Sequence, residues 1–249
     1  MPAQSVDKAL AILKQFSVAE PQLGVSELGR RLGLTKSTVH RLLRSLVRAG
    51  LAEQDPESRQ YMLGRETVQL GHTATFSIPL LRTALPFLHY LSNQVGEGVF
   101  LSERRGLEGA PVLQVLSPTM QDQLGWYTSS PLHSTASGKV LAAYASEDVL
   151  QALLDAGLVG ETEYTIMDPA ELRQELKRVR EQGYATSFEE SMLGTNGVAV
   201  PVRNPEGEVI ASLAIAGPSY RLTKERALAA VEQLKAVAGE ISRKLTGAH

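Results

Sequence analysis

The sequence predicts an α+β protein of two domains joined by a helical segment, and three observations lead to this class. Residues 1–63 show three helical apolar patterns followed by two short strand-like runs around a turn. The segment that follows carries helical patterns only. Beyond residue 97, three strand-like runs follow one another and two more come late in the chain, without the alternation of a parallel βαβ sheet. We place the domains at residues 1–65 and 78–249, with a linker helix at 66–77.

Composition excludes several classes of protein. The chain has 249 residues, 43% of them hydrophobic and none of them cysteine, which allows a packed core and excludes disulfides and thiolate metal sites. No apolar run approaches the ~18 residues of a membrane span. The N-terminal "MPAQSVDKAL" lacks the basic start and apolar segment of a signal peptide. We therefore expect a cytoplasmic protein without membrane contact.

Charge is distributed unevenly along the chain. Residues 1–70 carry 10 Lys+Arg against 7 Asp+Glu, and residues 71–249 carry 15 against 20, which together give the net charge of -2. Between Arg30 and Arg48 there are six lysines or arginines and no acid. Such a patch indicates a polyanionic partner, although charge alone also fits a solvated helix face.

The first two helices are predicted from apolar spacing and capping residues. "SVDKALAILKQF" starts with Ser5 as N-cap, and "VSELGRRLG" has Ser26 as N-cap with Leu28 and Leu32 on its buried side. The apolar positions expected to face the core in the first helix are Val6, Ala9, Leu10, Leu13 and Phe16.

The third helix has two distinct faces. It is predicted from Lys36 to about Ala49, with Thr35 as its cap. One continuous apolar stripe consists of Val39, Leu42, Leu43, Leu46 and Val47. The opposite face gathers Ser37, Arg41, Arg44 and Arg48, flanked by Thr38 and His40. Guanidinium groups and small hydroxyls on one face suit the major groove of DNA, and the helix N-terminus favours a phosphate.

A hairpin completes a winged helix-turn-helix. Gly50 ends the third helix, and "LAEQ" and "QYML" then predict two short strands around the turn "DPESR". Arg59 lies at the wing tip, where it can enter the minor groove or contact a phosphate. The alternative is a winged helix that only contacts proteins. The residues expected to bind DNA are Arg30, Lys36, Ser37, Thr38, His40, Arg41, Arg44 and Arg59.

The second domain is expected to hold an antiparallel sheet. One helix from Arg65 to about Phe76 and another from Pro79 to Val95, which Pro86 should kink or interrupt, lead into it. A last helix is predicted from Thr223 to about Leu245. The strand-like runs are "GVFLSERR", "APVLQVLS", "QLGWYTSS", "GVAVPVRN" and "VIASLAIAG". Sheets of this kind often carry a ligand cavity on one face.

No catalytic or metal signature is present. "SGK" at 137–139 looks like the end of a P-loop, but His133 stands where its first glycine should be. The five histidines show no metal spacing, and we expect no cofactor. Glu189 and Glu190 are adjacent and are interpreted as surface residues. "SPLHSTASGKVLAA" places small residues at a helix start, where backbone N–H groups can bind a carboxylate or simply accept an ordinary cap.

The whole chain resembles the IclR family of bacterial transcriptional regulators. The motifs that carry the resemblance, in family order, are "AQSVDKALAIL", "SELGRRLGLTKSTVHRLLRSLVRAGL", "YMLG", "SPLHSTASGKVLAA", "GYATSFEE", "VPVRNPEGEVIASLAIAGP" and "YRLT". The resemblance implies dimers formed through the DNA-binding domain, often paired into tetramers, on palindromic double-stranded operators. It also implies a GAF-like C-terminal domain in which a small organic or aromatic acid binds and alters repression or activation.

Site residues carried over from the family fall in both domains. Lys36, Ser37, Thr38, His40, Arg41 and Arg44 fall in the recognition helix. Ala136 and Ser137 fall in the loop whose backbone amides hold the effector's carboxylate. This chain departs from the commoner pattern at Ser187, where an aspartate is frequent, at Gly197, where a cysteine is frequent, and at Ala214 and Ala216, where serines are frequent.

Four interpretations follow from these departures and from the rest of the pattern. The site can take a larger or more apolar carboxylic acid, with Leu124 and Trp126 as a wall, or it can be vestigial in a constitutive regulator. An enzyme with a DNA-binding appendage is the rival from another class, and no nucleophile or metal constellation supports it. A pure interaction module would leave the arginine face without a role.

Overall fold

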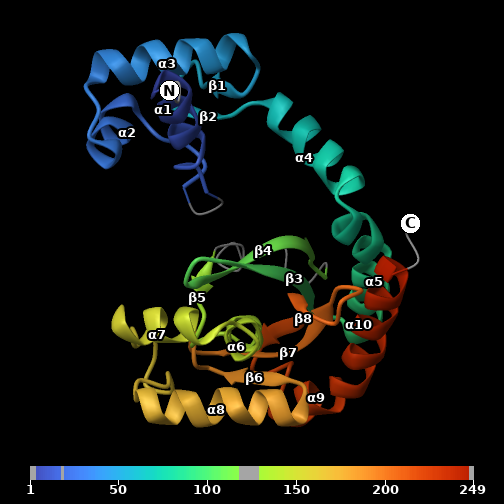
Figure 1. The fold of residues 1–249 in the computed structure, drawn as a ribbon. Helices are drawn as coiled ribbons and strands as arrows, with labels where there is room; N and C mark the ends of the chain where they lie inside the picture. Colours follow the sequence, from blue (N-terminus) through green and yellow to red (C-terminus); the bar gives the residue numbers. More distant parts are fainter. Residues whose placement is uncertain (1–3, 18–19, 118–128, 247–249) are drawn as a thin grey trace. The chain divides into compact units, whose positions relative to one another are not determined.

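The computed structural model describes residues 4–17, 20–117 and 129–246. The chain forms two compact units, one that ends at Ser77 and one that begins at Ile78 (Figure 1). Each unit has its own core of buried apolar side chains.

The first unit is a winged helix-turn-helix, as the sequence predicts. Strands β1 and β2 pair antiparallel to form the wing, and β2 leads directly into α4. The elements in order are α1 (Gln4–Leu13), α2 (Val25–Leu32), α3 (Lys36–Arg48), β1 (Ala52–Gln54), β2 (Tyr61–Leu63) and α4 (Arg65–Ser77).

The core of this unit is built from one face of each of the first three helices. Ile12, Leu28, Val39 and Leu43 are fully buried in it. Thr35 caps α3 as expected, because its hydroxyl accepts a hydrogen bond from the backbone N–H of Thr38. These contacts fix α3 with its apolar stripe inward and its basic face outward.

Four expectations for this unit are wrong. Ser5 lies within α1 (Gln4–Leu13) and is therefore not its N-cap. Val6 and Leu10 are 55% and 49% exposed, because α1 buries only the side that carries Ile12. Val47 is 39% exposed, since it lies at the edge of the α3 stripe. Helix α2 starts two residues earlier than predicted, with Gly24 and not Ser26 at its N-cap.

The second unit is a six-stranded antiparallel sheet with helices on both faces. The strand order is β5-β4-β3-β8-β7-β6. The strands are β3 (Gly98–Arg105), β4 (Glu108–Val115), β5 (Ser130–Pro131), β6 (Ala185–Phe188), β7 (Thr195–Arg203) and β8 (Val209–Pro218). The helices are α5 (Pro79–Val95), α6 (Ala136–Ala143), α7 (Glu147–Asp155), α8 (Pro169–Gln182), α9 (Lys224–Ala229) and α10 (Val231–Thr246).

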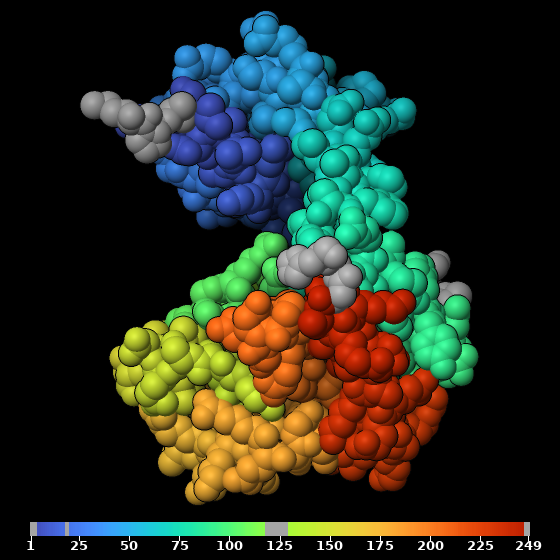
Figure 2. Space-filling view, turned by 45° about the vertical axis from the view of Figure 1, so that its right-hand side comes forward, coloured from blue at the N-terminus to red at the C-terminus, as the bar shows by residue number. Residues whose placement is uncertain are grey.

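The period of two along each strand separates the faces of this sheet. On β8, Leu213 and Ile215 pack with α5 and α10 in the main core, so Ser212, Ala214 and Ala216 stand on the opposite face. Helix α6 packs on that opposite face, and α8 packs against α6 (Figure 1). Helices α8 and α10 form much of the outer surface of this unit in Figure 2.

Several expectations for this unit need correction. Helix α5 is not interrupted at Pro86, although this proline has no N–H to donate to the helix ladder. The predicted last helix is two helices, α9 and α10, which break at Ala230. Strand β6 was not predicted. The predicted strand "QLGWYTSS" lies almost wholly outside the described residues, and its last serine, Ser130, begins β5.

Candidate functional site

Helix α3 presents an exposed basic face that has no partner within the described chain. Lys36, His40, Arg41 and Arg44 are all exposed, while the apolar stripe beneath them is at most 7% exposed from Val39 to Leu46. No carboxylate of the described residues forms an ion pair with these cations. Their charge is therefore available to a partner outside the chain.

The N-terminus of α3 adds hydroxyl groups to this face. Thr35 Oγ1 lies 3.1 Å from Ser37 Oγ and 2.9 Å from Thr38 Oγ1. These short side chains leave the first turn of the helix accessible. A phosphate at this end would meet hydroxyl donors and the positive end of the helix dipole.

The wing tip is a structured turn that holds Arg59 outward. The carboxylate of Asp55 accepts hydrogen bonds from the backbone N–H groups of Ser58, at 2.6 Å, and Glu57, at 3.0 Å. The bond from Ser58 is the main reason that the pKa of Asp55 is lowered. Arg59 has a φ of 60°, and its carbonyl oxygen accepts from Gln54 Nε2 at 3.0 Å. The exposed guanidinium is thus carried by a fixed backbone.

Arg30 differs from the other predicted DNA-binding residues. Its guanidinium pairs with Glu27 at 2.6 Å, and Arg31 is held between Glu27 and Glu20. These hydrogen bonds, that from Arg30 first, lower the pKa of Glu27 to about 2. The acid-free stretch that starts at Arg30 therefore has part of its charge offset by acids that precede it in the sequence.

The predicted effector residues come together where α6 begins above the sheet. Ser187 on β6 pairs with Gly197 on β7, and Gly197 pairs with Ala216 on β8. A Cβ atom at Gly197 would lie 3.5 Å from the Cβ of Ala216 and 3.9 Å from that of Ala136. Ala214 stands one step further along β8 on the same face. Small side chains thus let the start of α6 approach the sheet closely.

The N-terminus of α6 leaves backbone donors free. Thr135 caps the helix, because its hydroxyl accepts from Gly138 N at 2.9 Å. The Thr135 carbonyl accepts the first helical bond, from Lys139 N. No described residue accepts a hydrogen bond from the N–H of Ala136 or Ser137. Two adjacent N–H groups at a helix start can bind a carboxylate.

The structure also shows how the residues before α6 are held. Ser187 Oγ donates to the carbonyl oxygen of Ser134 at 2.8 Å. His133 is buried, with its Nε2 2.9 Å from the carbonyl oxygen of Val159. Ser187 therefore uses its hydroxyl to fix the loop that leads into the helix. The predicted wall residues Leu124 and Trp126 lie outside the described residues.

A buried ion-pair cluster beside α6 was missed by sequence reasoning. The side chain of Lys139 is 1% exposed, and its Nζ lies 2.8 Å from both carboxylate oxygens of Glu190 and 3.2 Å from Glu175 Oε1. Arg178 also pairs with Glu175, at 2.6 Å. Burial raises the pKa of Glu190, and Lys139 opposes that shift. The surface interpretation of Glu190 is wrong, and a lysine among small and apolar residues was the signal of burial.

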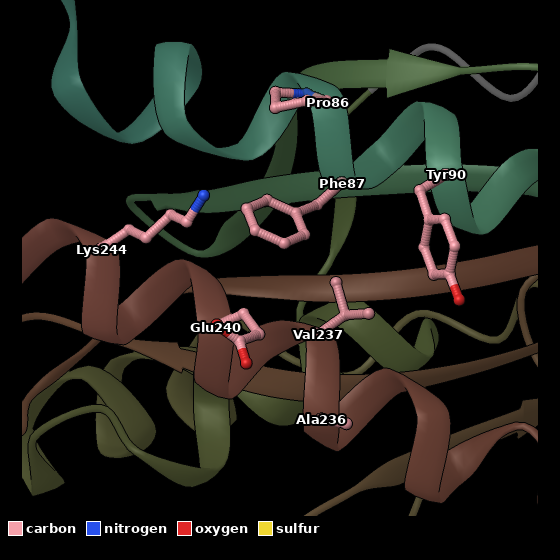
Figure 3. A pocket seen from close by; sticks show the side chains of 7 residues that line it. All are labelled: Pro86, Phe87, Tyr90, Ala236, Val237, Glu240 and Lys244. Atoms are coloured by element: carbon pink, nitrogen blue, oxygen red, sulfur yellow. The ribbon is translucent and has the colours of Figure 1, made fainter.

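A separate hollow lies on the other side of the sheet. It has a volume of about 430 Å³ and is lined by residues of α5 and α10, which also pack against each other (Figure 3). Lys244 Nζ stands 5.1 Å from the ring centroid of Phe87 at its edge. Its lining residues are Pro86, Phe87, Tyr90, Ala236, Val237, Glu240 and Lys244. None of them is a predicted effector residue.

The described residues contain neither a metal-binding cluster nor a membrane-spanning helix. No group of three histidine, aspartate or glutamate residues there could hold a metal ion. No helix in the described ranges is long and apolar enough to cross a membrane.

Two features together define a DNA-binding transcriptional regulator. The winged helix has a basic face on α3 that forms no ion pair among the described residues, and the second domain has the N-terminus of α6 packed on an antiparallel sheet. Comparison with known families agrees with this class. Residues 5–56 match the IclR helix-turn-helix domain, and residues 72–243 match the family described as bacterial transcriptional regulator IclR C-terminal. The chain belongs to the IclR family of transcriptional regulators.

Individual relatives are similar over nearly the full length. The HTH-type transcriptional regulator XynR of Escherichia coli (strain K12) is 35% identical, with 97% of each chain covered. KdgR of the same organism is 32% identical, with 96% of this chain and 94% of KdgR covered. Because the relatives are named as transcriptional regulators or repressors, the chain is a regulator and the enzyme alternative is excluded.

Solved structures show the same fold. An IclR transcriptional regulator from Alicyclobacillus acidocaldarius is 30% identical with a TM-score of 0.89, covering 98% of this chain and all of that one. An IclR homolog from Microbacterium hydrocarbonoxydans, complexed with 4-hydroxybenzoate, is 26% identical with a TM-score of 0.84 at the same coverage. The α+β class with a curled antiparallel sheet is confirmed by these structures.

Proposed function

We propose that this regulator binds a palindromic operator as a dimer and that a small carboxylic acid at the start of α6 modulates that binding. The observation that carries the proposal is the pair of free N–H groups at Ala136 and Ser137 above a sheet face of small residues. We assign DNA binding to residues 1–65, the linker to 66–77 and effector binding to 78–249. Because it acts on an operator, its place of action would be the cytoplasm.

The DNA-binding half of the proposal assigns α3 to the major groove. Arg41 and Arg44 project from the exposed face toward phosphates or base edges, and Ser37 lies near the helix start where close approach is needed. Arg59 reaches the minor groove or a phosphate from the wing. Lys36, Thr38, His40 and Arg30 complete the set of predicted contacts.

Self-association is supported by helix α4. It has 13 residues and buries none of them within the described chain. Val68, Leu70 and Phe76 are 72%, 60% and 49% exposed. Since isolated helices of this length are marginal in water, an apolar partner surface would stabilise α4. A second copy supplies that surface and places two recognition helices on two half-sites, and two such dimers would form a tetramer.

The effector half assigns the carboxylate to the α6 N-terminus. The relative with bound 4-hydroxybenzoate supports an organic acid as the class of ligand. The hydroxyl of Ser187 is engaged with Ser134, and Gly197, Ala214 and Ala216 offer no side-chain donor. Backbone amides therefore supply the contacts to the carboxylate, and the small side chains around them favour an acid that is apolar next to that group.

Two experiments on the full chain test the proposal. Selection of bound duplexes from a random pool should enrich an inverted repeat, and enrichment of a single unpaired half-site would refute the dimer. A thermal-shift screen of organic and aromatic acids should find a stabilising ligand, which at 100 times its Kd adds about 2.7 kcal/mol. A blank screen on folded protein that still selects DNA would favour the constitutive regulator with a vestigial site.

A further inference from the structure

One amide oxygen, Gln114 Oε1, is buried without a hydrogen-bond partner among the described residues, although the Gln114 residue as a whole is only partly buried. Among the described residues, four buried side-chain polar atoms lack one: Gln114 Oε1, His133 Nδ1, Asn196 Oδ1 and Ser212 Oγ. Asn196 still donates through its Nδ2 to Leu222, and His133 is held through its other ring nitrogen. Ser212 shares the sheet face of Ala214, and its hydroxyl can either donate or accept. A carboxamide oxygen can only accept, so Gln114 Oε1 needs a donor that the described residues do not provide.

The sheet register places Gln114 on the effector face. Gln114 on β4 stands opposite Phe100 on β3, and Phe100 stands opposite Ala214 on β8. The neighbours of Phe100 along β3, Val99 and Leu101, belong to the core under α5 and α10. Directly opposed residues of antiparallel strands share a face, so Gln114 stands on the same face as Ala214.

The distance between Gln114 and the α6 start limits the size of a ligand that touches both. The start of α6 lies against Gly197 on β7, and three strand spacings, about 14 Å, separate the backbones of β7 and β4. The glutamine side chain covers part of this span. A ligand whose carboxylate binds Ala136 and Ser137 would reach the amide oxygen with a group on the far side of a six-membered ring.

We propose that Gln114 is a specificity-determining residue that accepts a hydrogen bond from a donor on the end of the effector remote from its carboxylate. The effector class is then a carboxylic acid with a distal hydroxyl or N–H group. This inference rests on the effector site proposed above. A site that leaves a buried acceptor unpaired rejects the analogue without the donor, because the acceptor loses water and gains nothing.

The test compares two probe acids that differ only in the distal donor. Benzoate and 4-hydroxybenzoate are titrated calorimetrically into the full chain, into Gln114→Leu, and into Gln174→Leu, which makes the same change at an exposed position of α8. The hydroxylated acid should bind the unaltered chain and Gln174→Leu about tenfold or more tightly than benzoate. In Gln114→Leu the two acids should bind alike.

The outcomes separate the role of Gln114 from the existence of the effector site at the start of α6. Equal binding of both acids to the unaltered chain would overturn the role of Gln114 and leave the effector site standing. Discrimination that persists in Gln114→Leu would do the same. Binding of neither acid would overturn the inferred effector class, and the thermal-shift screen of other acids would then decide separately whether the α6 site binds any acid. If Gln114→Leu does not fold, Gln114→Glu, which keeps an acceptor at this position, should retain the preference for the hydroxylated acid.

Discussion

Helices α3 and α6 begin with the same kind of cap, but the charged side chains of α3 are exposed to solvent and the lysine of α6 is buried. Each starts after a threonine whose hydroxyl accepts from the backbone N–H three residues on, at 3.3 Å in α3 and 2.9 Å in α6. The cations of α3 are exposed and unpaired within the described residues, whereas Lys139 of α6 is buried between two carboxylates. The cap sets where a helix begins, and the layers packed around it decide whether its N-terminus can meet a long polyanion or only a small anion.

The largest expected effect is on the buried side of this comparison. Lys139→Met should lower the free energy of unfolding by about 3 kcal/mol or more, because Glu190 and Glu175 lose their shared cation inside the protein. Urea denaturation measures the change. Lys177→Met is the control, since that lysine is on α8 with its side chain 77% exposed, and its effect should stay within about 0.5 kcal/mol. A similar loss in both variants would mean that the buried pair has no special weight.

The same cluster should make stability depend on pH. Burial raises the pKa of Glu190 in the folded state, so the folded state holds its proton at pH values where the unfolded state has released it. Stability therefore falls as pH rises above 4.5, the ordinary value, through the raised pKa. Lys139→Met should steepen this fall because it removes the opposing cation, and adding Glu190→Gln should flatten it. Urea denaturation midpoints between pH 4 and 7 measure this dependence. If Lys139→Met/Glu190→Gln lost stability with pH as steeply as Lys139→Met, Glu190 would not be the group responsible.

On the exposed side, Arg41 and Arg44 should dominate DNA affinity. Arg44→Ala should weaken all duplexes by a similar factor and reduce the salt slope by about 1, while Arg41→Ala or Ser37→Ala should change base preference if those side chains read base edges. Fluorescence anisotropy against salt concentration separates the two effects. Unchanged binding by the Arg41→Ala/Arg44→Ala double variant would contradict the placement of α3 in the groove.

At Arg30 we expect a smaller effect on DNA affinity, and a gain where the arginine variants above cause a loss. Glu27→Gln should release Arg30, while Arg31 stays paired with Glu20, and it should raise the affinity for nonspecific duplex with a steeper salt slope. Glu57→Gln on the wing, an exposed acid that forms no ion pair within the described chain, serves as the matched change of charge. A gain of equal size in both variants would show that only net charge matters, and no gain would place Arg30 away from the DNA.

The two helices also show what sequence can and cannot predict. The two faces of α3 follow from a local repeat of 3.6 residues, so their residues could be assigned before the structure was known. Lys139 and Glu190 are 51 residues apart, and no local pattern brings them together. Gln114 reaches the effector face only through the register of three strands. The break at Ala230 follows neither proline nor glycine, and the predicted apolar periodicity continues through it.

The threonine caps themselves should give the smallest effects and the closest comparison. Thr35→Ala and Thr135→Ala should each lower the free energy of unfolding by about 1 kcal/mol, because each leaves one N-terminal N–H without its acceptor. The loss at Thr135 should be the larger of the two, since water can replace the hydroxyl at exposed Thr35 but reaches half-buried Thr135 less easily. Serine at either position keeps the acceptor and should restore most of the stability.

The functional consequences of the two cap variants should differ. Thr35→Ala should weaken DNA binding and leave effector affinity unchanged, and Thr135→Ala should weaken effector binding and leave DNA affinity unchanged. Anisotropy with operator DNA and calorimetry with the effector acid measure the two, and a Thr135→Ala variant that lost DNA but kept its acid would show that α6 is not the effector helix.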